Sequence, residues 1–161
     1  MNTRLFTLGC LLPFSLYAGP LPPLAGEALG MANLLALNKL EPNYLVLDLN
    51  GDGTKDNVLF VEDRTTKKKG LCVLYSGSDQ CMLIGAGKRF YAAGDDFRWV
   101  DYWEVASPGE TWETTFTPDR DVFGEQKVNL ANESVRVCAD EGGCGVIAFR
   151  QGEYLWVHQG D

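Results

Sequence analysis

The chain has very little histidine and comparatively little positive charge. Among its 161 residues His158 is the only histidine, whereas most zinc sites and most Ser/His or Cys/His catalytic sets require imidazole side chains. Its 14 Lys and Arg residues face 22 Asp and Glu residues, which gives a formal net charge of -8. This charge disfavours binding to nucleic acid and permits a cationic partner. The composition therefore favours a binding protein over an enzyme, and we expect no catalytic residues.

Long apolar runs are also missing, and none approaches the roughly 18–20 uncharged apolar residues of a membrane span. The most apolar run, Leu5 to Tyr17, follows Arg4 and precedes Ala18, an arrangement typical of a secretory signal peptide. The sequence therefore predicts a signal peptide over residues 1–18. We expect a periplasmic protein without membrane insertion.

Four cysteines downstream of the expected signal peptide predict a disulfide framework. They are Cys72, Cys81, Cys138 and Cys144. An even number of cysteines in an exported chain indicates disulfide bonds, with three possible connectivities. A turn at Ser76-Gly77 favours a Cys72 to Cys81 bridge across a hairpin, and a turn centred on Glu141 places Cys138 opposite Cys144. Residues 19–161 are expected to form a single disulfide-stapled, β-rich domain.

Short β-rich runs separated by turn residues dominate this domain. Apolar residues at helical spacing predict one helix over Leu24–Leu40, which Pro42 would end. Strands are predicted at Tyr44–Asp48, Asn57–Glu62, Gly70–Tyr75, Cys81–Gly85, Tyr102–Ala106, Thr111–Phe116, Val128–Leu130, Ser134–Cys138, Val146–Arg150 and Glu153–His158. The expected fold is mainly β, an antiparallel hairpin meander that is propeller-like or sandwich-like, with one N-terminal helix.

The segment LVLDLNGDGTKDNVLFV places oxygen-bearing side chains at alternate positions. They are Asp48, Asn50, Asp52, Thr54 and Asp56. The side chains of four of them, with the backbone carbonyl of Thr54, suit a hard cation such as calcium. Leu59 stands at the twelfth loop position, where an EF-hand has glutamate, so the loop is not an EF-hand.

The same loop, from about Leu45 to Val61, resembles the DxDGDGxxD element of the extracellular, propeller-like FG-GAP/VCBS repeats. The resemblance implies calcium bound between two strands by the five loop residues. A hairpin that holds no ion is the alternative, because Asn, Asp and Gly favour such turns by themselves. One copy cannot make a propeller of repeated blades.

The segment from residue 85 to 116 interleaves aromatic rings with carboxylates, which would suit a basic protein partner or, for the rings, an ordinary core. Within it the loop Ser107-Pro108-Gly109 has the composition of a projecting turn that could plug a partner's cleft. We take Trp103, Glu104 and Glu110 as candidate contacts beside this loop.

Taken as a whole, the chain resembles a family of small exported proteobacterial proteins through its LDLNGDG, LIGAGKRF, DDFRWVDYWEV and GEYLWVHQGD segments. Some proteins of this type are similar to periplasmic immunity proteins of type VI secretion effectors that cut peptidoglycan. The resemblance implies a periplasmic inhibitor that binds a peptidoglycan amidase and occludes its Cys/His active site with a loop. By its shape alone, this loop corresponds to Ser107, Pro108 and Gly109. The negative charge of the chain would suit a basic peptidoglycan hydrolase as the target.

Two other functions remain open from the sequence. One is a calcium-stabilised periplasmic or envelope module whose ligand is a glycan or a structural protein. An acid-pair glycoside hydrolase would use two of the many carboxylates, but the sequence gives no distance between any two of them.

Overall fold

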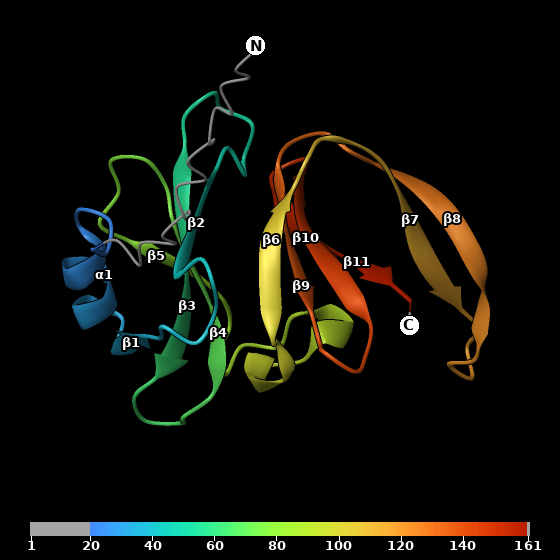
Figure 1. The fold of residues 1–161 in the computed structure, drawn as a ribbon, viewed down its shortest axis with the longest axis horizontal. Coiled ribbons are helices and arrows are strands. Elements are labelled where there is room, and N and C mark those ends of the chain that lie inside the picture. The colour runs from blue at the N-terminus through green and yellow to red at the C-terminus, as the bar shows by residue number, and fades with distance from the viewer. Residues whose placement is uncertain (1–19, 161) are drawn as a thin grey trace, which may run out of the picture.

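The computed structural model describes residues 20–160, which form two antiparallel sheets, a separate β-hairpin and a short helix (Figure 1). The elements are α1 (Ala25–Met31), β1 (Leu34–Ala36), β2 (Tyr44–Leu47), β3 (Asp56–Asp63), β4 (Lys69–Leu74), β5 (Cys81–Gly85), η1 (Tyr91–Ala93), η2 (Phe97–Trp99), β6 (Tyr102–Ala106), β7 (Gly109–Phe116), β8 (Val122–Leu130), β9 (Ser134–Cys138), β10 (Cys144–Arg150) and β11 (Glu153–Gln159). The predicted mainly β, antiparallel fold with one N-terminal helix is confirmed, and it is sandwich-like.

The first sheet is built around β3. Strands β1 and β2 pair with one edge of β3, at Leu34 with Asp63 and at Tyr44 with Leu59, and β4 pairs with the other edge and carries β5. All four residues from Val58 to Val61 are buried. Side chains on both faces of β3 are apolar because α1 covers one face of the sheet and the second sheet covers the other.

The second sheet has the strand order β11-β10-β9-β6. Its inner face contributes Trp103, Val137 and Ile147 to the main core, where they meet Phe60 and Val73 of the first sheet. Burial of each such side chain contributes about 1.5–3 kcal/mol before the entropy of ordering is subtracted. The two sheets therefore fold as one unit around a shared core.

The β7–β8 hairpin makes the topology differ from a simple meander. It leaves the second sheet after β6 and returns to it at β9, and it projects at the right of Figure 1. Strand β8 begins at Val122, six residues before the predicted start at Val128. Most of its side chains are exposed, so it lacks the apolar alternation that marks a half-buried strand.

The predicted helix over Leu24–Leu40 is too long. Helix α1 ends at Met31, Asn33 has a left-handed φ of 57°, and Leu34 begins a strand that pairs with β3. Gly26 and Gly30 weaken the helix by about 1 kcal/mol each relative to alanine. Pairing with the exposed edge of β3 overrides the helical periodicity of the leucines.

Both predicted disulfide pairs are confirmed. Cys138 lies directly opposite Cys144 in the β9–β10 ladder, with Cα atoms 4.1 Å apart. Cys72 lies opposite Leu83 rather than opposite Cys81, so the first bridge crosses the β4–β5 hairpin diagonally, with Cα atoms 5.3 Å apart. The difference arises because the loop between β4 and β5 is longer than the two-residue turn expected at Ser76-Gly77.

The predicted signal peptide, residues 1–18, lies outside the described residues. From residue 20 to residue 160, no helix has the length and apolar character required to cross a membrane.

Candidate functional site

The aspartate loop connects β2 to β3, and its side chains form hydrogen bonds mainly with the backbone of the loop itself. Asp48 accepts hydrogen bonds from the amides of Gly51 at 2.8 Å and Gly53 at 3.0 Å. Both glycines have left-handed φ angles, 77° and 86°, which a residue with a Cβ rarely adopts. The sequence pattern Asp-x-Asn-Gly-x-Gly is therefore explained locally by a tight Asx-type turn.

The middle of the loop is held by Asp52. Its carboxylate accepts hydrogen bonds from the amide of Thr54 at 2.8 Å, from the Thr54 hydroxyl and from the Asn50 side chain at 3.0 Å. The bonds from the Thr54 hydroxyl and amide hold the pKa of Asp52 below its usual value. This carboxylate remains charged and exposed to solvent.

Asp56 differs from the other loop aspartates because it is fully buried. Its two oxygens accept hydrogen bonds from the amides of Leu49 at 3.3 Å and Ser76 at 3.2 Å. Burial raises the pKa of Asp56, against the opposing effect of these two amides. Asp56 thus fastens the aspartate loop to the β4–β5 loop.

Two residues that the sequence did not indicate complete this region. Glu133, between β8 and β9, accepts hydrogen bonds from the amide of Asp48 and from Lys55, both at 2.6 Å. The Lys55 ammonium, followed by the Asp48 amide, lowers the pKa of Glu133. Asn132 packs so closely that a Cβ on Gly51 would lie 2.5 Å from its side-chain oxygen. No local pattern signals these contacts, which join residues about 80 positions apart.

Four of the five predicted metal ligands lie in the aspartate loop and Asp56 begins β3, but their side chains are engaged by the loop and its neighbours. Across residues 20–160, no group of three or more His, Cys, Asp or Glu side chains is placed so that it could hold a metal ion. Asp48 and Asp52 offer charged oxygens of the type calcium prefers, whereas Asp56 is buried and already bonded to two amides.

The loop Ser107-Pro108-Gly109 joins β6 to β7, and all three residues are exposed. Because Ala106 pairs with Ser134 and Gly109 pairs with Leu130, this loop and the β8–β9 connection run side by side. The β8–β9 connection in turn contacts the aspartate loop, so the three loops lie together at the upper end of the molecule in Figure 1.

The carboxylates near this loop are exposed and paired with cations. Glu104 lies 3.5 Å from Arg136, and Glu110 lies 2.6 Å from Lys127. With Ser107 they line a polar hollow of about 270 Å³ between β6, β7 and β9. Exposed ion pairs of this kind contribute little stability, so both carboxylates can change partners at small cost.

Trp103, a candidate partner contact in the sequence, is a core residue instead. Its side chain is 3% exposed, packs edge-on against Phe60 at 6.2 Å and donates its indole N–H to the Pro42 carbonyl at 2.7 Å. Alternation along β6 sends Trp103 inward and Glu104 outward. The expectation that Trp103 contacts a partner is therefore wrong, whereas Glu104 and Glu110 lie on the surface as expected.

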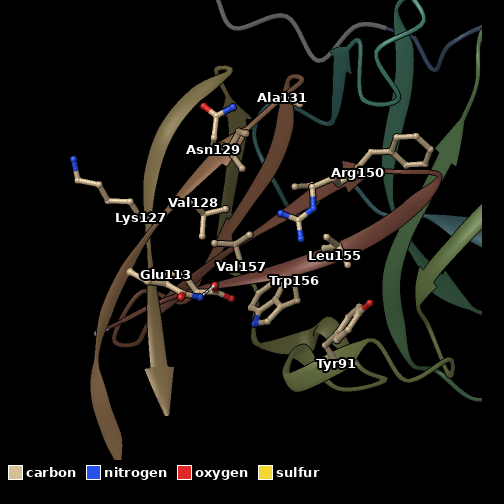
Figure 2. Close-up of a pocket in the computed structure, with 14 residues that line it drawn as sticks. Tyr91, Glu113, Lys127, Val128, Asn129, Ala131, Arg150, Leu155, Trp156 and Val157 are labelled. Carbon is tan, nitrogen blue, oxygen red and sulfur yellow. Dashed lines mark hydrogen bonds between the residues drawn. The ribbon is translucent and has the colours of Figure 1, made fainter.

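A pocket of about 400 Å³ lies between β8 and the outer face of β10 and β11. Figure 2 shows Glu113, Arg150 and Tyr91 reaching it from three different elements. Glu113 is the one carboxylate in its lining, and it accepts a hydrogen bond from Gln126 at 2.6 Å. This pocket therefore does not contain the pair of acids that glycoside hydrolysis requires.

Comparison with family models, with curated proteins and with solved structures finds no match to this chain.

Proposed function

We propose that this protein is a periplasmic inhibitor that binds a basic, cell-wall-degrading enzyme, a peptidoglycan amidase, and occludes its active site. The exposed Ser107-Pro108-Gly109 loop is the observation that carries the proposal. It stands at one end of the sandwich, between a strand rooted in the core by Trp103 and a strand of the projecting hairpin. A short, proline-containing loop on a rigid base loses little entropy on binding.

Charge supports a basic target. The chain carries a formal charge of -8, and Glu104 and Glu110 flank the loop on the surface. Opposite charge on the enzyme would raise the association rate and orient the encounter. The two disulfide bonds suit an exported protein, and the signal peptide expected over residues 1–18 would deliver it to the periplasm, where a toxin that cuts peptidoglycan acts.

The first experiment is a pull-down of proteins from the producing bacterium with the disulfide-intact mature chain, read by mass spectrometry. We expect stoichiometric retention of a peptidoglycan hydrolase. The purified hydrolase is then titrated with the wild type and with Ser107→Tyr. A bulky ring at the tip of an occluding loop should weaken binding at least 100-fold.

Ser76→Tyr is the matched control, because it places the same ring at an exposed serine in the β4–β5 loop. It should bind like the wild type. Equal affinity of the Ser107→Tyr variant would refute the placement of the occluding loop, and retention of no hydrolase would refute inhibition itself.

A calcium-stabilised envelope module is the second candidate, favoured by the Asp48 and Asp52 carboxylates that the aspartate loop carries. It predicts a rise in melting temperature when calcium replaces chelator, because binding to the folded state alone stabilises it. The variant Asp48→Asn, Asp52→Asn should lose that rise. A melting temperature that calcium leaves unchanged would exclude this candidate.

A further inference from the structure

We infer that the end of the β7–β8 hairpin is a second contact surface, which inserts apolar side chains into a cleft of the same basic hydrolase. This inference rests on the proposed function. It assigns to the partner an apolar depression with a basic rim. This depression lies apart from the partner's active site, which the Ser107 loop covers.

The hairpin carries the most exposed large apolar side chains of the described chain. Phe123 is 78% exposed and Val122 is 69% exposed, and both lie just past the turn of the hairpin. Trp112 and Phe116, on β7, are 50% and 45% exposed. Large rings and branched side chains gathered on one projecting element are typical of contact surfaces, whereas isolated exposed ones are ordinary.

The hairpin is braced against the body, so this surface is held in position before binding. The Phe116 ring packs edge-on against His158 of β11, with centroids 4.9 Å apart. Gln159, also on β11, donates to the Thr111 hydroxyl at 2.7 Å. Because β7 is fixed at these points, the hairpin would lose little conformational entropy when a partner binds.

Charge distinguishes a basic partner from a second copy of this chain. From Gly109 to Leu130 the hairpin has five acidic and two basic residues, and its turn holds Asp119, Arg120 and Asp121. Two such hairpins face to face would place like charges together around the apolar residues, which opposes self-association. Lys and Arg around a partner's apolar cleft would complement them.

The spacing of the two surfaces fits a single partner. The Ser107-Pro108-Gly109 loop lies at the root of the hairpin, and the turn lies at its other end, after the eight residues of β7. Eight residues of extended strand span about 25 Å. An interface of ordinary size, about 800 Å² on each partner, extends over such a distance.

The test uses the hydrolase retained in the pull-down and compares wild type with the double variant Val122→Ser, Phe123→Ser by calorimetry. We expect at least 30-fold weaker binding and an unchanged melting temperature, because both side chains are exposed. The matched control is Val46→Ser, Met82→Ser, which removes two large apolar side chains exposed on the first sheet. It should bind like the wild type.

A photo-crosslinking amino acid in place of Phe123 gives a second readout. We expect irradiation to link the chain to the hydrolase at an apolar cleft with basic neighbours. If wild type and the tip variant bind the hydrolase equally and no crosslink forms, the hairpin inference is overturned and the proposed inhibition stands.

Two other outcomes overturn the inference. A concentration-dependent dimer that the tip variant abolishes would assign the surface to a second copy of the chain. Failure of the wild type to retain any hydrolase would overturn the inhibition and the hairpin contact together.

Discussion

Replacing Trp103 by phenylalanine separates a core role from a contact role for this residue. The indole is 3% exposed, packs against Phe60 and donates to the Pro42 carbonyl at 2.7 Å. The lost hydrogen bond costs about 1 kcal/mol. The smaller ring removes buried apolar area and leaves unfilled volume, which costs roughly 1–2 kcal/mol more.

We therefore expect Trp103→Phe to lower the free energy of unfolding by about 2–3 kcal/mol. For a domain of this size, that corresponds to a fall in melting temperature of about 10 °C. Urea unfolding of the disulfide-intact chain, followed by circular dichroism, measures the change. The variant should still bind the hydrolase with nearly wild-type affinity at a temperature where it is folded.

Trp112→Phe makes the same chemical change at a side chain that is 50% exposed. Its unfolding free energy should stay within about 0.5 kcal/mol of the wild type. The reasoning fails if Trp103→Phe is as stable as this control. It fails equally if Trp103→Phe keeps its stability and loses tenfold or more in affinity, because Trp103 would then be a contact residue.

Two further substitutions test the packing and the electrostatics. Gly145→Ala should cost about 1–3 kcal/mol by urea unfolding, because its Cβ would lie 2.0 Å from the Trp156 ring, and a cost below 0.5 kcal/mol would mean that the ring moves freely. Glu133→Gln should cost about 1 kcal/mol at pH 7, because the charged bonds from Lys55 and the Asp48 amide are weakened. Since these bonds lower the folded-state pKa of Glu133, its stabilisation is present above the unfolded value of about 4.3 and is lost as pH falls through the folded pKa. The stabilities of wild type and Glu133→Gln should therefore converge in acid, and a constant difference between pH 7 and pH 2 would contradict this account.

The strands were predictable where local sequence determines them. The bounds of β5, β6 and β9 and, to within one residue, those of β2 through β4 follow from short apolar runs that turn residues delimit. The Cys138 to Cys144 bridge was also predictable from local sequence, because a short hairpin between two cysteines leaves little choice of register. These features depend on neighbours in sequence, which a pattern can record.

The errors arise where distant segments decide the conformation. Leu34–Ala36 has helical periodicity, but a free edge of β3 pairs with it. Strand β8 lacks a buried face, so its pattern resembles a polar loop. Trp103 looks like a contact residue because tryptophan is frequent at interfaces, and only the packing of the second sheet on the first shows that it is buried. In each case the deciding contact lies far away along the chain.

The site shows the same division. The aspartate loop was visible in the sequence, but Glu133 and Asn132 were not, and they are what joins it to the neighbourhood of the Ser107 loop.

This junction bears on how calcium experiments are interpreted. An ion that rearranged the aspartate loop would disturb Asn132 and Glu133, and through the β8–β9 connection it would shift the Ser107 loop as well. Calcium dependence of binding is therefore compatible with inhibition. The discriminating result is the effect of Ser107→Tyr: an inhibitor loses its target with and without calcium, whereas an envelope module that binds elsewhere keeps its ligand.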